Sequence, residues 1–125
     1  MLDPTKILVV EDDADSRRVL SYLLRRAGFC VVESATVAQG IANISNQAVA
    51  LLDLNLPDGL GTEVLIQIRM QAHHTRVAFI TATYDPERLH CLTALTADAI
   101  FTKPMVFGVV LDWINQPVVH LLTAV

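Results

Sequence analysis

The fold of this chain is decided by residues 7–12, which read Ile7-Leu8-Val9-Val10-Glu11-Asp12: an apolar run that ends in two carboxylates. Three further runs end in functional groups: Val49-Ala50-Leu51-Leu52 before Asp53, Val77-Ala78-Phe79-Ile80 before Thr81, and Ile100-Phe101-Thr102 before Lys103. If the runs are parallel strands of one sheet, all four endings fall on its carboxyl edge, where open α/β sheets bind their ligands. The pattern predicts one pocket with three carboxylates, a hydroxyl and an ammonium group. That set suits a divalent metal ion and a phosphoryl group.

Short β-branched runs alternate with longer segments of helical periodicity, which is typical of repeated βα units around a parallel sheet. We expect strands near residues 6–10, 30–33, 48–53, 77–81 and 99–102, with helices between them and a fifth helix after Pro104. Asp13 or Asp15 is expected to cap the first helix, and Gly28 to end it in the left-handed conformation. Asp85-Pro86 should begin the fourth helix. Residues 55–61 are rich in turn formers and are expected to form a loop that overhangs the pocket.

Length and composition favour one acidic domain. The 125 residues fit a single domain, which we assign to residues 1–116, with an apolar tail at 117–125. Charged residues make up 18% of the chain, below the usual share of about 25%, so we expect a partner to cover part of the surface. The net charge of −4 argues against direct binding to nucleic acid.

The cysteines and the C-terminal segment bear on the cellular compartment. Cys30 and Cys91 lack metal-ligand spacing and no secretory signal is visible, so we interpret both as free thiols in the cytoplasm. Cys30 lies in an apolar run and is expected in the core. Residues 105–125 are about long enough to span a membrane. We expect no span, because five residues in this window are unsuited to a membrane interior: Asp112, Asn115, Gln116, Pro117 and His120.

The acidic residues have the chemistry of a magnesium-dependent phosphorylation site. Mg²⁺ takes oxygen ligands from one or two carboxylates and from phosphate, and Glu11, Asp12 and Asp53 meet that demand. A carboxylate can also act as the nucleophile on phosphorus, and the added negative charge then needs neutralisation by a cation such as Lys103. A hydrogen bond from Thr81 to the phosphoryl group would exist only after phosphorylation, which makes it a switch.

Four motifs, in this order, resemble those of the response regulator receiver domain of two-component signalling: 7–13 (ILVVEDD), 52–59 (LDLNLPDG), 80–82 (ITA) and 102–104 (TKP). The resemblance runs from Lys6 to about Ile114. It implies a flavodoxin-like, doubly wound (βα)5 fold with a five-stranded parallel sheet.

Site roles follow from the same resemblance. It implies that Asp53 is the phospho-acceptor and that Asp12 binds Mg²⁺ (or Mn²⁺) directly, while Glu11 supports the ion through water and Asn55 offers its backbone carbonyl. Thr81 and Lys103 would contact the phosphoryl group, and Lys103-Pro104 would be a cis peptide.

The family also implies a partner and a reaction. Its phosphoryl donor is a phosphohistidine on a histidine kinase or histidine phosphotransfer protein. The receiver catalyses its own phosphorylation and slow dephosphorylation, so it is not a conventional enzyme. Positions equivalent to Asn55 and Thr83 influence the rate of hydrolysis.

Three features depart from the family pattern. Ile100 stands where many receivers carry a Tyr or Phe that swings inward on activation, and Phe101 should face the opposite side of the sheet. Thr96 replaces a frequent Gly, which removes an easy left-handed end for the fourth helix. The last helix has two apolar stripes, one of Val106, Val109, Val110 and Trp113 and one of Phe107, Leu111 and Ile114.

A helix that is apolar on all sides is buried on more than one side. We therefore hypothesise a homodimer or partner contact through the fourth helix, fifth strand and fifth helix. The expected switch and interface residues are Thr81, Ile100, Phe101, Phe107, Leu111 and Ile114.

Two other functions remain open at this stage. One is an interaction module that keeps the fold but works without phosphorylation. The other is a small phosphohydrolase, which would need a general acid two residues after Asp53, where Asn55 cannot serve.

Overall fold

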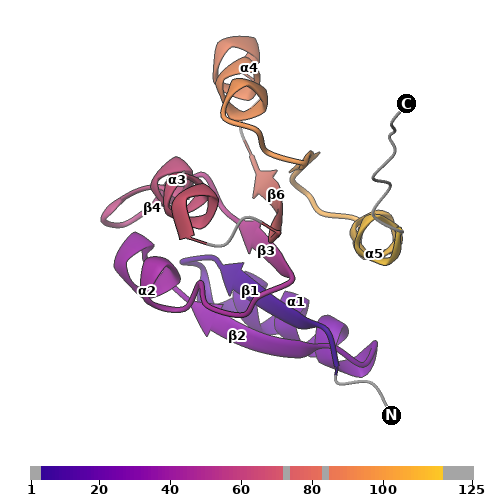
Figure 1. Cartoon of the computed structure of the whole chain (residues 1–125). Helices are drawn as coiled ribbons and strands as arrows, with labels where there is room; N and C mark the ends of the chain where they lie inside the picture. The colour runs from indigo at the N-terminus through magenta and orange to yellow at the C-terminus, as the bar shows by residue number, and fades with distance from the viewer. Residues whose placement is uncertain (1–3, 72–73, 83–84, 117–125) are drawn as a thin grey trace, which may run out of the picture.

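Five parallel strands form the central sheet of the computed structural model, which describes residues 4–71, 74–82 and 85–116. The strands are β1 (Lys6–Val10), β2 (Cys30–Ser34), β3 (Val49–Leu52), β6 (Arg76–Thr81) and β7 (Ala99–Thr102). They are ordered β2-β1-β3-β6-β7 (Figure 1). The predicted five-stranded parallel sheet is confirmed.

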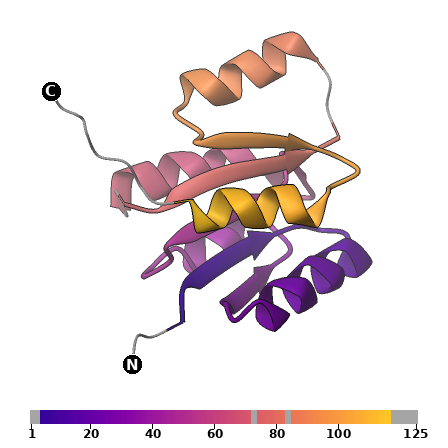
Figure 2. The same cartoon turned by 90° about the vertical axis from the view of Figure 1, so that its right-hand side faces the viewer.

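Helices pack on both faces of this sheet (Figures 1 and 2). They are α1 (Ala14–Arg26), α2 (Val37–Ala42), α3 (Gly61–Gln71), α4 (Pro86–Ala94) and α5 (Phe107–Asn115). α1 and α5 share a core with Ile7 and Val9 of β1, while α2, α3 and α4 share the other core with Leu8 and Val10. Neighbouring residues of a strand point to opposite faces. The strand sequences are therefore continuously apolar because both faces are covered.

The order of the strands creates a crevice at one edge. The chain passes from β1 to β2 on one side and then returns to β3 on the other side of β1, so the connections diverge between the carboxyl ends of β1 and β3. Ligands of doubly wound sheets bind at such a reversal point. Glu11 and Asp12 follow β1 and Asp53 follows β3, so the acidic residues meet there.

Most helix ends form where the local sequence predicts them. The Asp13 carboxylate accepts a hydrogen bond from the Ser16 amide (2.8 Å) and caps α1. Gly28 has a φ of 97° and ends the same helix in the left-handed region, as expected. Asp85 caps α4 directly before Pro86.

Residues 55–61 do not form a simple loop, and that prediction was wrong. β4 (Asn55–Leu56) pairs antiparallel with β5 (Gly59–Leu60), and α3 already begins at Gly61. The side chain of Leu56 is buried, and the Asp58 carboxylate accepts hydrogen bonds from the amides of Val37 (2.7 Å) and Ala38 (3.1 Å) at the start of α2. These contacts with distant residues hold the turn formers in a small hairpin.

Two burial predictions were also wrong. Cys30 is exposed because it opens β2, which lies at the edge of the sheet. In α5 the residues of one predicted apolar stripe are not all buried on the same side of the helix. Val110 and Ile114 are buried against the sheet, whereas Val106 and Val109, assigned to the same stripe as Val110, are 64% and 53% exposed.

None of the helices in the described part of the chain is long and apolar enough to span a membrane. The apolar tail at 117–125 lies outside the described residues.

Thr96 ends α4 in the left-handed conformation, with a φ of 67°, although it is β-branched. The backbone amide of the next residue, Ala97, donates a hydrogen bond to Leu92 O (3.1 Å) in the last turn of α4. We expect Thr96→Gly to raise the free energy of unfolding by about 0.5–1 kcal/mol, because glycine adopts this conformation without the Cβ clash. Denaturant unfolding measures the change. Thr93→Gly in the last turn of α4 is the control and should cost up to about 1 kcal/mol; a loss of stability at position 96 would contradict the prediction.

Candidate functional site

The carboxylates predicted from the sequence converge at the carboxyl edge of the sheet. Hydrogen bonds of the sheet extend to them: the Glu11 amide donates to Ser34 O (3.0 Å) and the Asp53 amide to Val10 O (2.9 Å). One carboxylate oxygen each of Glu11, Asp12 and Asp53 lies within 4.8 Å of the others. Strand endings far apart in the sequence therefore form one acidic cluster.

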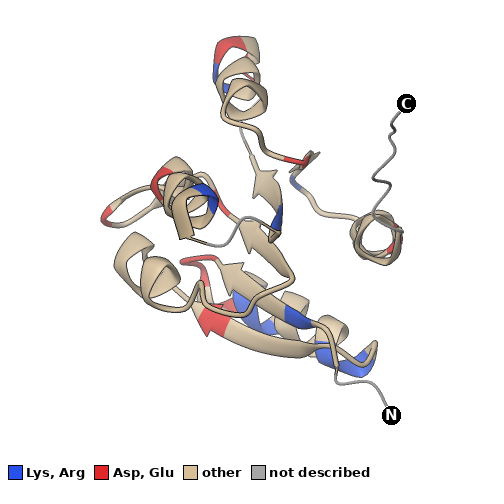
Figure 3. Cartoon of the chain, in the orientation of Figure 1, with Lys and Arg blue, Asp and Glu red and all other residues tan. Residues whose placement is uncertain are grey.

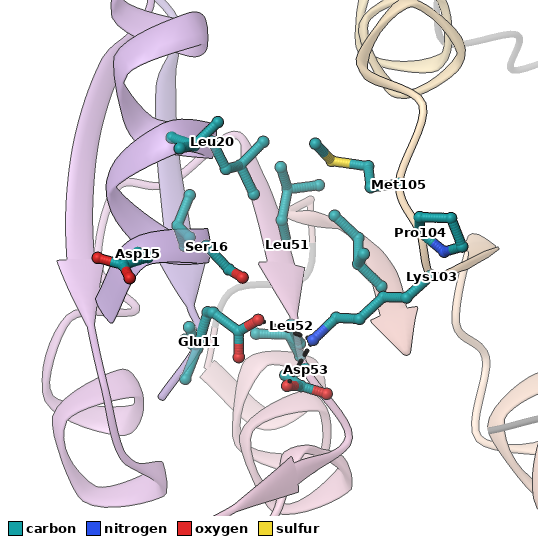
Figure 4. A pocket seen from close by; sticks show the side chains of 14 residues that line it. Glu11, Asp15, Ser16, Leu20, Leu51, Leu52, Asp53, Lys103, Pro104 and Met105 are labelled. Atoms are coloured by element: carbon teal, nitrogen blue, oxygen red, sulfur yellow. Dashed lines mark hydrogen bonds and ion pairs between the residues drawn. The ribbon is translucent and has the colours of Figure 1, made fainter. Parts of the chain in front are cut away.

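Lys103 reaches this cluster from the end of β7. Its Nζ donates to Glu11 Oε1 (2.7 Å) and to Asp53 Oδ2 (3.1 Å), as Figure 4 shows. Glu11 and Asp53 are only 6% and 9% exposed. The ammonium group thus links two buried carboxylates that would otherwise repel each other.

The remaining predicted residues lie around this ion-pair network. Thr81, the last residue of β6, is fully buried, and its carbonyl accepts a hydrogen bond from the Lys103 amide (2.8 Å). Asn55 begins β4, two residues after Asp53. The Lys103-Pro104 peptide bond is cis, as predicted. Thr83 lies outside the described residues.

The two residues singled out on β7 face opposite sides of the sheet. Ile100 packs with the core beneath α2, α3 and α4, whereas Phe101 packs with the core beneath α1 and α5. The Phe101 ring meets the ring of Trp113 of α5 edge-on, with centroids 6.0 Å apart. The predicted alternation is confirmed, and Phe101 does not take the place of Ile100.

Arg17 of α1 is a site residue that the sequence reasoning missed. Its guanidinium donates to the backbone carbonyl of Glu11 (2.8 Å) and lies 3.5 Å from the Glu33 carboxylate. These contacts hold the turn that carries Glu11 and Asp12. Its sequence position marks it only as part of the charged face of a helix, so no sequence signal distinguished it.

Burial and the adjacent Asp53 carboxylate raise the pKa of Glu11 from 4.5 to about 7, although Lys103 acts in the opposite direction. Burial lowers the pKa of Lys103, but its hydrogen bonds to Glu11 and Asp53 outweigh this and raise the pKa overall. The Lys103 ammonium therefore stays charged at neutral pH, whereas the Glu11 carboxyl group titrates close to neutral pH.

The donor set fits Mg²⁺. All three clustered side chains offer oxygen, and Glu11 Oε2, a buried atom, has no hydrogen-bond partner among the described residues. A hard divalent cation prefers such ligands, and it would offset the repulsion that raises the pKa of Glu11. Histidine and cysteine, which other metals favour, contribute nothing to this described cluster.

The raised pKa of Glu11 predicts that its contribution to stability falls between about pH 4.5 and pH 7. In this window the folded protein binds more protons than the unfolded chain, so the free energy of unfolding decreases as pH rises. Mg²⁺ should restore more stability at about pH 8 than at about pH 5. Thermal unfolding with and without Mg²⁺ at both pH values measures this. Glu11→Gln is the control and should lose this part of the pH dependence; an unchanged slope would contradict the assignment.

Comparison with known proteins identifies the family. The family model described as "Response regulator receiver domain" matches residues 7–115. The chain belongs to the response regulator receiver domain family. All four motifs quoted above lie within the matched range.

Curated relatives contain this receiver domain as part of longer chains. The cyclic di-GMP phosphodiesterase of Thermotoga maritima is 31% identical over 99 residues, which is 79% of this chain and 27% of that protein. The sensory/regulatory protein RpfC of Xanthomonas campestris is 33% identical over 114 residues, 86% of this chain and 16% of that protein. The cell cycle transcriptional regulator CtrA of Caulobacter vibrioides is 29% identical over 101 residues, 79% of this chain and 44% of that protein. This chain therefore spans less than half the length of each of these relatives.

Solved receiver domains have the same fold. A CheY-like receiver domain protein from Methanospirillum hungatei superposes with a TM-score of 0.82 at 29% identity, covering 89% of this chain and 90% of that one. The BeF3-activated DrrB receiver domain gives the same TM-score at 28% identity, covering 89% and 94%. The predicted fold and family are confirmed: this is a receiver domain of two-component signalling.

Proposed function

We propose that this receiver domain accepts a phosphoryl group on Asp53 in a Mg²⁺-dependent reaction. The observation that carries the proposal is the bridge of Lys103 between Glu11 and Asp53, beside an acidic cluster that suits a divalent cation. A half-buried ammonium group next to the acceptor can neutralise negative charge as it develops on the phosphoryl oxygens.

The reaction is an exchange of one bond on phosphorus. An Asp53 carboxylate oxygen attacks the phosphorus atom of a phosphohistidine, a P–O bond forms, and the P–N bond to the imidazole breaks. The imidazole leaves with the electron pair of that bond and takes up a proton. Bound Mg²⁺ would supply charge neutralisation and orient the phosphoryl oxygens. Glu11, Asp12 and the Asn55 carbonyl are its proposed ligands with Asp53, and Mn²⁺ could replace it.

Two side chains of this chain would respond to the new group. Lys103 would exchange its hydrogen bond with the Asp53 carboxylate for one with a phosphoryl oxygen. Thr81, which ends the neighbouring strand, would donate its hydroxyl hydrogen bond to another. The Lys103 amide donates to Thr81 O, and Met105, two residues after Lys103, packs in the core with α5. We propose that the change is transmitted to the surface formed by α4, β7 and α5, where Ile100 and Phe101 lie on opposite faces of β7.

A histidine kinase or a histidine phosphotransfer protein is the proposed phosphoryl donor. The support is membership of the receiver family, together with the similarity of this chain to a sensory/regulatory protein and to a transcriptional regulator. We propose that the domain signals and does not turn over free substrates.

Incubation with Mg²⁺ and a small acyl phosphate tests the proposal. Intact-protein mass spectrometry should show the gain of one phosphoryl group, which Asp53→Asn should abolish because the amide is not a nucleophile. Asp58→Asn is the matched control, since Asp58 lies five residues later, in the turn between β4 and β5, and bonds to α2; it should still be modified. No mass gain in the folded wild-type protein would contradict the proposal, and rapid multiple turnover of unrelated monoesters would favour a phosphohydrolase.

Exposed apolar residues at the start of α5 support a second proposal, association through α4, β7 and α5. Val106 and Val109 are 64% and 53% exposed, and Asp112 is the single charged residue of α5. Figure 3 accordingly shows α5 mostly in tan. An unshielded apolar stripe of this kind is typical of a contact surface. Sedimentation at high concentration, with and without phosphorylation, should detect a dimer that Val109→Lys weakens. A monomer under both conditions would exclude the homodimer.

A further inference from the structure

An apolar pocket of about 400 Å³ opens beside the acidic cluster, between α1 and the segment that follows Lys103 (Figure 4). Its floor consists of strand residues, chiefly Val9, Leu51 and Ile80. Leu20 of α1 and Met105 form opposite walls in Figure 4. The volume falls in the range of about 300–1,000 Å³ that is usual for sites that bind small molecules.

The pocket has two chemically different ends. Aliphatic side chains of the core beneath α1 and α5 line most of it, including Val9, Leu20 and Leu51. The other end contains the carboxylates of Glu11 and Asp53 with the ammonium group of Lys103, and Asp15 also contributes to the lining. Two carboxylates, Glu11 and Asp53, face one ammonium group, and the exposed Asp15 carboxylate lies at the rim, so the polar end carries a net negative charge that favours a cation.

One hydrogen-bond acceptor at this end has no partner in the described part of the chain, which favours a ligand that carries hydrogen-bond donors. Glu11 lines the pocket and is 94% buried, since its exposed fraction is 6%. Its Oε1 accepts from Lys103, but its Oε2 has no partner among the described residues. An unpaired carboxylate oxygen in a buried position is costly, and an N–H donor would remove that cost.

The residues at the start of α5 are exposed and do not line the pocket. Val106, which precedes α5, is 64% exposed, and Val109 is 53% exposed. On the α1 side, Ser16, a small and exposed residue, lines the pocket, so we place the mouth of the pocket there. The pocket is therefore accessible to a ligand.

We propose that this pocket binds a small cationic amphiphile, a primary alkylammonium ion. Its apolar chain would lie between α1 and Met105, over Leu51, and its ammonium group would donate to Glu11 Oε2. Such a ligand combines the burial of apolar surface with a charge-assisted hydrogen bond. It uses the same carboxylates as a divalent cation and would compete with one for this site.

The test uses the unphosphorylated full chain without acyl phosphate, so its result does not depend on whether Asp53 accepts a phosphoryl group. Hexylammonium, hexanoate and ethylammonium are titrated in turn, and amide NMR shifts of β1, β3 and α1 are followed. Hexylammonium should bind at least tenfold more tightly than either other probe, because hexanoate has the wrong charge and ethylammonium lacks four methylene groups. Added Mg²⁺ should weaken hexylammonium binding. Equal binding of the three probes, tighter binding of hexanoate, or no effect of Mg²⁺ would overturn the proposal.

A pair of variants locates the site. Ser16→Trp should block the mouth and weaken hexylammonium binding at least tenfold, whereas Ser45→Trp, an exposed position that does not line this pocket, should leave it unchanged. Circular dichroism checks that both variants fold. Binding to Ser16→Trp as tight as to the wild type would place hexylammonium elsewhere and overturn the assignment.

Discussion

Replacing Gly61 with alanine is expected to lower the free energy of unfolding by about 3 kcal/mol and to displace Asp53. A Cβ at position 61 would collide with the backbone carbonyl oxygen of Asp53 and would lie 3.1 Å from the Phe79 ring. A backbone carbonyl cannot rotate away as a flexible side chain can, so the turn after β3 must move. The Gly61 amide also bonds to Leu54 O (2.7 Å), which ties the first turn of α3 to the same segment.

The effect at Gly61 has a matched control in Gly108 of α5. No atom lies within 4 Å of a Cβ built there, so Gly108→Ala should raise the free energy of unfolding by about 0.5–1 kcal/mol through helix propensity. Urea unfolding of both variants measures the difference. We also expect Gly61→Ala, and not Gly108→Ala, to weaken Mg²⁺ binding, since Asp53 belongs to the acidic cluster. Wild-type stability in Gly61→Ala would contradict the close approach of the two segments.

Replacing Lys103 with methionine is expected to destabilise the metal-free protein by about 2 kcal/mol near pH 8. Methionine keeps much of the side-chain volume but leaves the Glu11 and Asp53 carboxylates facing each other without a cation. Removing one partner of a fully buried ion pair costs about 3–5 kcal/mol, and the cost here is smaller because the Lys103 side chain is 30% exposed. The loss should shrink toward pH 5, where Glu11 is protonated in the folded protein.

The same variant should bind Mg²⁺ about tenfold more tightly, because the cluster loses a competing positive charge. Thermal unfolding and isothermal titration calorimetry with Mg²⁺ measure the two effects. Lys6→Met is the control, since Lys6 is exposed at the start of β1 and far from the carboxyl edge; it should change neither quantity strongly. Weaker Mg²⁺ binding by the Lys103 variant would mean that the ammonium group does not oppose the metal.

Much of the fold could be predicted from the sequence because its causes are local. An apolar run such as residues 7–10 specifies a strand covered on both faces, and the side chain of Asp13 or the absent Cβ of Gly28 specifies a helix end without regard to the rest of the chain. The acidic cluster was equally predictable. Once the strands are parallel, residues that follow them meet at one edge, whatever the packing behind them.

The wrong predictions concern burial and local structure that depend on which helices and strands become neighbours. Cys30 was expected in the core because its run is apolar, but only the strand order places β2 at the edge, where its first residue is exposed. The hairpin at 55–60 depends on the bonds of Asp58 to α2, which lies about twenty residues earlier in the sequence. The exposed side of α5 depends on the angle at which this helix meets the sheet.

The sequence by itself determined the strands, the helix ends and the identity of the charged groups at the carboxyl edge, since these follow from the spacing of apolar, capping and acidic residues. Only the tertiary structure decided that Lys103 bridges Glu11 and Asp53, that Arg17 supports the turn before α1, and that a pocket remains open beside them. The physical reason is distance: hydrogen bonds, desolvation and cavities depend on separations of a few ångströms between residues as much as 92 positions apart.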